Sequence, residues 1–197
     1  MGNFYKLSNF KIEKKNFVNK KKNRINIVFL GRINPIKNIE FQILAIKFLI
    51  DKKINLLFNI YGPVEDKNYK TKIEKMILKY NLTNVVKFNN PIKNNLKFNI
   101  LKFSDIVFLT SNYECNSMLA LETIASGGCL VTTKKTNLSE FKDQQLILQL
   151  SSSNKIFCKE LYTLIKKEKN IKRIKKNSYL YNQKLNLENY KDNLKKL

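Results

Sequence analysis

The stretch DIVFLTSNYECNSMLALETIASGGCLVTT, residues 105–133, indicates the fold most clearly. It begins with an apolar run at residues 105–110, which is typical of a strand buried on both faces of a parallel sheet. After a polar loop, residues 117–126 carry apolar side chains at helical spacing, and a pair of glycines ends this helix. A second apolar run follows at residues 129–133. The stretch therefore predicts two parallel strands connected by a helix.

The same alternation extends on both sides of this stretch. We expect four further strands, at residues 25–31, 56–62, 85–88 and 146–150, and five further helices, at residues 39–51, 69–80, 94–103, 154–167 and from 171 onwards, as one helix or a pair. Six apolar strands separated by helices predict an α/β fold, with a single Rossmann-like, doubly wound parallel sheet and C-terminal helices.

The composition is that of one globular domain. The chain has 197 residues, of which 43% are hydrophobic and 27% charged, so it is long enough for a core of its own and is not intrinsically disordered. It contains no histidine, which excludes nucleophile–histidine pairs and imidazole metal ligands within the chain. Three cysteines without CxxC spacing argue against a disulfide framework and favour a reducing compartment.

No segment resembles a membrane anchor or a secretory leader. No window approaches the roughly 20 consecutive apolar residues of a membrane-spanning helix, and residues 1–22 lack the apolar core of a signal peptide. We therefore expect a cytoplasmic protein.

The net charge of +23 is concentrated at the two ends of the chain. Residues 1–24 hold 8 basic and 1 acidic side chains, and residues 155–197 hold 13 basic and 4 acidic ones. Surface drift towards lysine is the simplest explanation, and peripheral contact with anionic lipid headgroups or acidic partners is the alternative. The chain lacks the motifs of nucleic-acid binders, so we expect no nucleic-acid partner.

The strand order identifies two loops as the candidate site. In a doubly wound sheet of order 3-2-1-4-5-6, ligands bind where the loops after the first and fourth strands face each other. The first of these loops is GRINPIKN, residues 31–38. Its Arg32 and Lys37 place two cations beside a helix N-terminus, which suits a phosphate or diphosphate. Solvated surface cations explain this loop equally well when it is taken alone.

The second loop is SNYECNS, residues 111–117. Asn116 or Ser117 caps the next helix, whose N-terminal amides attract anions. Glu114 and Glu122 are carboxylates of the kind that accept hydrogen bonds from sugar hydroxyls at nucleotide crevices. Each also has an ordinary explanation, as a solvated loop residue for Glu114 and as a helix-stabilising carboxylate for Glu122. Their coincidence with two cations at one crevice favours a ligand site.

Three stretches in the correct order resemble the retaining GT-B glycosyltransferases of family 4, the glycosyl transferases group 1 family. GRINPIKN resembles the G-R-x-x-x-x-K-[GN] loop of that family, and residues 104–133 resemble its donor-site stretch, which includes Glu-x7-Glu. Residues 61–92 resemble the block between them, and the resemblance covers residues 25–141. The family's usual Gly after the first Glu is replaced by Cys115, and its usual Glu before the loop lysine is replaced by Ile36.

The resemblance implies a role for each site residue. Arg32 and Lys37 would bind the donor diphosphate and stabilise it as a leaving group, and Glu114 would lie at the donor sugar, so these three would be catalytic. Glu122 would bind the ribose. The family requires no divalent metal, and no Asp-x-Asp pair is present. The remaining donor contacts would come from residues at the loop, the helix start and the base: Gly31, Asn116, Ser117, Met118, Pro91 and Ile92.

The resemblance covers only the C-terminal, donor-binding half of the two-domain GT-B unit. It implies a lead-in segment at residues 1–24, a nucleotide-sugar-binding domain at 25–168 and a basic helical segment at 169–197. An N-terminal Rossmann-like partner domain would supply the acceptor site and the family's active-site histidine. We expect glycosyl transfer from a UDP- or GDP-sugar, with retention, to a glycan or lipid-linked acceptor in polysaccharide or glycolipid synthesis. One alternative is an inert nucleotide-sugar-binding module or the orphan half of a split transferase, and another is a basic nucleic-acid or membrane-surface binder.

Overall fold

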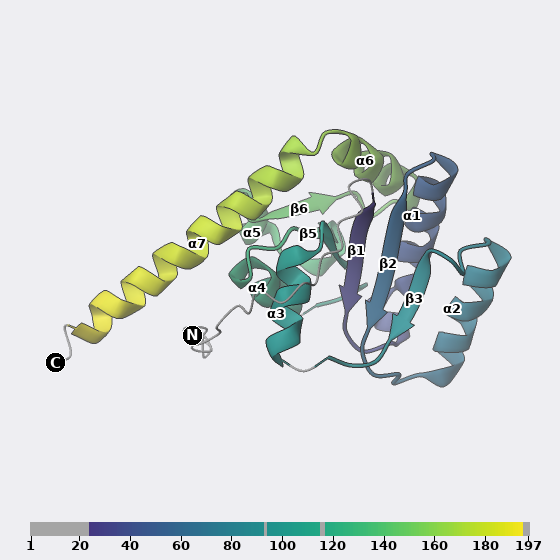
Figure 1. Cartoon of the computed structure of the whole chain (residues 1–197), viewed down its shortest axis with the longest axis horizontal. Helices are drawn as coiled ribbons and strands as arrows, with labels where there is room; N and C mark the ends of the chain where they lie inside the picture. The colour runs from purple at the N-terminus through teal and green to yellow at the C-terminus, as the bar shows by residue number, and fades with distance from the viewer. Residues whose placement is uncertain (1–23, 93, 115–116, 195–197) are drawn as a thin grey trace.

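A six-stranded, wholly parallel sheet forms the centre of the computed structural model, which describes residues 24–92, 94–114 and 117–194 (Figure 1). Neighbouring strands lie in the order β3-β2-β1-β4-β5-β6, which confirms the predicted doubly wound fold. The strands are β1 (Ile25–Leu30), β2 (Leu56–Tyr61), β3 (Val86–Asn89), β4 (Ile106–Leu109), β5 (Leu130–Thr133) and β6 (Ile147–Leu150).

Helices connect the strands at nearly the predicted positions. The α-helices are α1 (Ile39–Asp51), α2 (Lys67–Lys79), α3 (Asn94–Phe103), α4 (Met118–Ala125), α5 (Ser139–Asp143), α6 (Asn154–Lys166) and α7 (Lys169–Leu194), and two short 3-10 helices are η1 (Pro35–Lys37) and η2 (Lys134–Thr136). Sequence periodicity did not predict α5, η1 or η2, because three to five residues are too few to show a helical repeat. The last predicted helical segment is one continuous helix, α7, which extends beyond the body of the domain (Figure 1).

Both faces of the sheet are buried, which explains why the strands are continuous apolar runs. Phe29 and Phe108 belong to the core under α1, α2 and α6. Val28 and Val107, one residue earlier in the same two strands, belong to the core under α3 and α4. Each fully buried side chain of this size contributes about 1.5–3 kcal/mol to folding, so the two cores together hold the central strands in register.

The first half of α7 packs against the body of the domain. Ile174 is buried there, the Ser178 hydroxyl donates to the Leu146 carbonyl at 3.2 Å, and the Asn182 side-chain amide donates to the Ala125 carbonyl at 2.8 Å. The boundary between the nucleotide-sugar-binding domain and the basic C-terminal segment, placed between residues 168 and 169, stays a prediction. Of the predicted lead-in segment, residues 1–23 lie outside the described residues.

Two further sequence expectations concern cysteines and membrane spans. Cys129 and Cys158 are free and buried, and burial raises the pKa of their thiols to about 12 and about 11. Cys115 lies outside the described residues. Among the helices that the structure describes, none is both long and apolar enough to cross a bilayer.

The sheet opens at the carboxyl ends of its two central strands. β1 and β4 pair only through Ile27–Ile106 and Val28–Val107, so their last residues are not bridged to each other. Beyond the strands the two loops meet again, because the Asn112 amide N–H donates to the Ile36 carbonyl at 2.9 Å. The unbridged strand ends and the joined loops surround a crevice at the predicted switch point.

Candidate functional site

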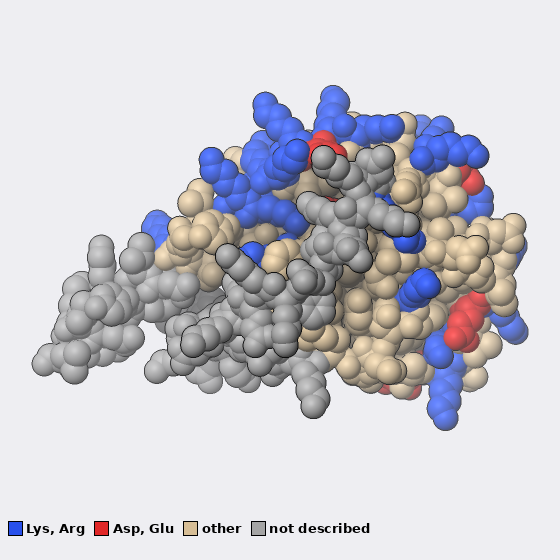
Figure 2. Space-filling view, in the orientation of Figure 1, with Lys and Arg blue, Asp and Glu red and all other residues tan. Residues whose placement is uncertain are grey.

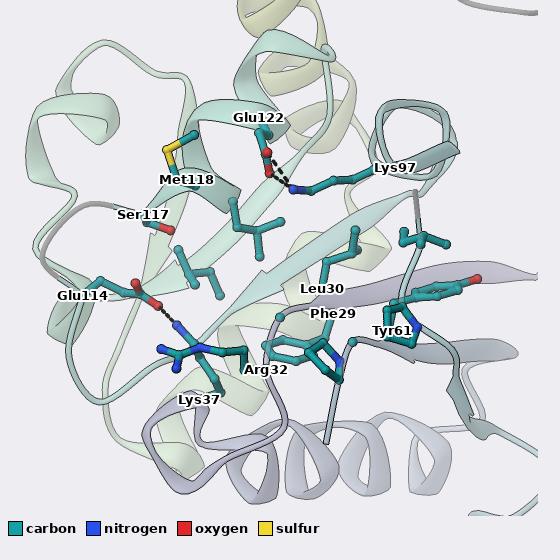
Figure 3. A pocket seen from close by; sticks show the side chains of 17 residues that line it. Phe29, Leu30, Arg32, Lys37, Tyr61, Lys97, Glu114, Ser117, Met118 and Glu122 are labelled. Carbon is teal, nitrogen blue, oxygen red and sulfur yellow. Dashed lines mark hydrogen bonds and ion pairs between the residues drawn. The ribbon is translucent and has the colours of Figure 1, made fainter. Parts of the chain in front are cut away.

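A pocket of about 480 Å³ occupies this crevice (Figure 3). Its walls come from the carboxyl ends of β1, β2 and β4, from the loop before α3 and from the start of α4. The lining residues are Phe29, Leu30, Gly31, Arg32, Lys37, Tyr61, Gly62, Pro63, Pro91, Ile92, Lys97, Leu109, Glu114, Ser117, Met118, Leu119 and Glu122. Nine of the ten predicted site residues therefore line one pocket, and the tenth, Asn116, lies outside the described residues.

Lys37 and Glu114 form an ion pair across the crevice. The Lys37 ammonium lies 2.7 Å from Glu114 Oε1, and the two side chains are 18% and 11% exposed. The Ser111 hydroxyl donates to the same carboxylate oxygen at 2.6 Å. The backbone of η1 presents the lysine, because the Asn34 side chain caps the turn by accepting from the Lys37 amide N–H at 3.3 Å. A cation and a carboxylate are thus held together at the point where the two loops meet.

Arg32 lies at the rim of the pocket and points to a different carboxylate. Its guanidinium is 2.6 Å from Glu65 Oε1, and its side chain is 59% exposed. The Asn34 side-chain amide donates to the second oxygen of Glu65. Sequence reasoning missed Glu65 because it lies in the loop after β2, outside the two loops that the strand order nominates.

The start of α4 contributes a helix N-terminus to the pocket. The Ser117 hydroxyl accepts from the Ala120 amide N–H at 3.3 Å and caps the helix. The amides of the first turn have no partners within the helix, and the helix dipole favours an anion near them. The predicted cap therefore forms with Ser117.

Glu122 lies one turn further along α4 and is held by a lysine from α3. The Lys97 ammonium is 2.6 Å from Glu122 Oε1 and 2.5 Å from Oε2 (Figure 3). Sequence reasoning missed Lys97, because no motif distinguishes it from the other lysines of the chain. Its position on the predicted helix 94–103 was the only available signal, and that signal is weak without the packing of α3 beside α4.

An apolar wall faces these charged groups. It is formed by Pro91 and Ile92, before α3, and by Tyr61, at the end of β2. Burial raises the pKa of the Tyr61 hydroxyl above its usual value, so this group stays protonated at neutral pH and is available as a hydrogen-bond donor. A flat apolar surface beside fixed charges is suited to a ring with a polar edge, such as a nucleobase.

The residues that the structure describes contain no cluster of three or more carboxylate, cysteine or histidine ligands for a metal ion. The charged groups of the pocket are three cations, Arg32, Lys37 and Lys97, and two carboxylates, Glu114 and Glu122. The pocket is thus suited to bind an anion through its own side chains and helix amides.

Comparisons with known proteins agree with this fold. The family model "Glycosyl transferases group 1" matches residues 10–181. The C-terminal domain of a glycosyl transferase group 1 family protein, LpcC from Francisella tularensis, superposes with a TM-score of 0.69 at 23% identity, over 79% of this chain and 82% of that domain. A search among curated proteins found no match.

Two longer solved structures contain the same fold. HepE of Anabaena, solved in complex with UDP and glucose, superposes with a TM-score of 0.71 at 17% identity. The match covers 82% of this chain and 44% of the HepE chain. WaaG, a glycosyltransferase involved in lipopolysaccharide biosynthesis, gives a TM-score of 0.73 at 17% identity, over 83% and 44% of the two chains. The chain therefore spans less than half the length of these proteins.

Proposed function

The chain belongs to the glycosyl transferases group 1 family, and from this premise we propose that its pocket binds the nucleotide-diphosphate part of a sugar donor. The observation that carries the proposal is that Arg32, Lys37 and the N-terminus of α4 line one pocket at the carboxyl ends of β1 and β4. Two cations and the positive end of a helix dipole match the charge of a diphosphate.

In the proposed reaction the diphosphate is the leaving group. The bond between the anomeric carbon and the diphosphate oxygen breaks, the sugar passes to an acceptor hydroxyl with retention, and negative charge develops on the departing diphosphate. Lys37 and Arg32 stabilise that charge, because groups already placed where charge develops lower the barrier most. Glu114 lies beside Lys37 and faces the donor sugar in this proposal.

The nucleoside occupies the other end of the pocket. Glu122 accepts hydrogen bonds from the ribose hydroxyls, and Pro91 and Ile92 lie beside the base. UDP is the first nucleotide to test, because HepE was solved with UDP and glucose. The proposal includes no metal ion, since Arg32, Lys37 and the helix N-terminus of the pocket are the groups that contact the diphosphate in it.

Full activity requires a second domain in this proposal. Several large apolar side chains at the rim of the crevice are exposed to solvent: Ile36, Val64 and Met118. Contact with an N-terminal Rossmann-like partner domain would cover them and bring in the acceptor, which we propose to be a glycan or a lipid-linked sugar. The alternative is a module that binds the donor and transfers nothing.

Calorimetric titration of the chain with UDP, UDP-glucose, GDP and GDP-mannose tests the proposal. We expect binding of at least one of these nucleotides, and weaker binding after Arg32→Ala. Lys75→Ala, which removes an exposed lysine from α2, is the matched control and should not alter the affinity. Binding without hydrolysis or transfer supports the inert module, and no binding to any of the four overturns the proposal.

Glu65→Gln is expected to tighten nucleotide binding by about two- to fivefold. The substitution removes a carboxylate that competes with the diphosphate for Arg32, and an exposed ion pair of this kind is worth up to about 1 kcal/mol. Glu74→Gln is the control, because Glu74 forms an exposed ion pair with Lys70 on α2. Equal or weaker UDP binding by Glu65→Gln in calorimetry would show that Glu65 does not hold Arg32 away from the ligand.

The basic surface suggests where the protein acts in the cell. Lysine and arginine gather over α6 and the start of α7 (Figure 2), and we propose a cytoplasmic protein in peripheral contact with the anionic inner face of a membrane. Sedimentation with phosphatidylcholine vesicles, with and without phosphatidylglycerol, at about 0.15 M salt tests this contact. Failure to sediment with the anionic vesicles would exclude it. The exposed cations are Lys155, Lys159, Lys166, Lys167, Lys169, Lys172, Arg173 and Lys176.

A further inference from the structure

The ion pair between Lys97 and Glu122 joins two helices at the nucleoside end of the pocket. Lys97 lies on α3 and Glu122 lies on α4, and the two residues are 25 positions apart in the sequence. Their side chains are 24% and 16% exposed, so solvent screens this pair less than the pairs on the surface. Both side chains line the pocket and point towards each other (Figure 3).

The contact uses both oxygens of the carboxylate. An ammonium has three N–H donors, and a carboxylate has about four acceptor positions. The ammonium donates a hydrogen bond to Oε1 at 2.6 Å and lies 2.5 Å from Oε2, which is buried and accepts no hydrogen bond from the described residues, so the carboxylate is held at both oxygens and keeps unused acceptor positions. Since Glu122 lines the pocket, those positions are available to a ligand there.

We propose that Lys97 is a positioning residue for ribose recognition: it holds the Glu122 carboxylate in the orientation that accepts hydrogen bonds from the ribose hydroxyls. This inference rests on the proposed function and adds to it a residue outside the motifs of the donor loops. A glutamate has three rotatable side-chain bonds, so ordering it only when the ligand binds costs rotamer entropy. The lysine orders it beforehand.

Lys97 also neutralises the charge of Glu122. Losing this neutralisation would affect binding differently from losing the orientation of the carboxylate. An unpaired carboxylate in the pocket repels the diphosphate of any nucleotide, whether or not its ribose carries hydroxyls. Loss of orientation, in contrast, weakens only those ligands that have ribose hydroxyls. The comparison of UDP with 2′,3′-dideoxy-UDP therefore separates the two effects, because both ligands carry the same diphosphate.

Calorimetric titration of both nucleotides into Lys97→Met and Lys97→Arg variants tests the inference. For the wild-type chain we expect UDP to bind about tenfold more tightly than 2′,3′-dideoxy-UDP, as two hydrogen bonds to a carboxylate allow. Lys97→Met should reduce this preference to about twofold, and Lys97→Arg, which keeps two donors for the carboxylate, should restore most of it. Glu122→Gln in the Lys97→Met background should lower the preference no further.

Lys102→Met is the matched control, because it removes a lysine from the opposite end of α3. It should keep the full tenfold preference, and thermal melting of all variants checks that α3 remains folded. A Lys97→Met variant that still prefers UDP about tenfold overturns the inference alone. A wild-type chain that binds neither UDP nor GDP overturns the proposed function and this inference with it.

Discussion

Lys37→Ala is expected to lower the rate of sugar transfer or donor hydrolysis by about 10²–10³-fold. Loss of one preorganised group that stabilises developing charge costs about 3–4 kcal/mol of barrier. The structure adds a second reason, because Glu114 is only 11% exposed and would keep the Ser111 hydroxyl as its partner but lose the lysine. A carboxylate without a counter-charge would then face the incoming diphosphate.

These two contributions can be separated by a double-mutant cycle. UDP affinity should fall in Lys37→Ala and recover in part in Lys37→Ala/Glu114→Gln, because the second substitution removes the uncompensated charge. UDP carries no donor sugar, so the loss of a contact between Glu114 and the donor sugar does not enter this measurement. Lys75→Ala again serves as the control, and unchanged kinetics in Lys37→Ala would exclude Lys37 from the chemistry.

Gly62→Ala is expected to destabilise the domain by about 3 kcal/mol or more and to remove nucleotide binding. Gly62 has a φ of +149°, and a Cβ at this position would lie 1.8 Å from the Gly31 carbonyl oxygen. The obstacle is the backbone of the neighbouring loop, which no rotamer change can relieve. Because both glycines line the pocket, the two loops would have to separate where the diphosphate is proposed to bind.

Urea and thermal unfolding of Gly62→Ala measure the effect, and a loss of 3 kcal/mol corresponds to roughly 6–12 °C in Tm for a domain of this size. Gly127→Ala is the matched control. Its φ is +72°, yet its added Cβ would meet no atom closer than 3.6 Å, so it measures backbone strain without the clash, at about 1–2 kcal/mol. Equal stability of the two variants would mean that the loops do not approach closely.

The layered α/β fold could be predicted from the sequence because the central strands β4 and β5 are buried on both faces. A run such as that of β4 leaves no polar face, and runs of this kind alternate with amphipathic helices, which is the pattern of a doubly wound sheet. The order of such a sheet, in which the first and fourth strands are neighbours, brings the loops that carry Lys37 and Glu114 to one crevice, although these residues are 77 apart in the sequence. The candidate crevice was therefore predictable before any side chain was placed.

The ion pairs around the crevice could be predicted only in part. Lys97 and Glu65 carry no motif, and whether a lysine on α3 reaches a glutamate on α4 depends on how the two helices pack. The close approach of Gly62 to Gly31 is likewise a contact between two loops. No periodicity or spacing encodes such distances, because each depends on residues far away in the sequence.

The sequence was sufficient to predict the layers and the place of the site, since the layers follow from which residues avoid water and the site follows from where a doubly wound sheet opens. The pairing of the charges depended on the tertiary structure. That structure joined Arg32 to Glu65 and Glu122 to Lys97, because ion pairs form between whichever side-chain ends packing brings within a few ångströms. The pattern of hydrophobic residues therefore predicts where the crevice lies, and side-chain packing determines which charged residues form ion pairs inside it.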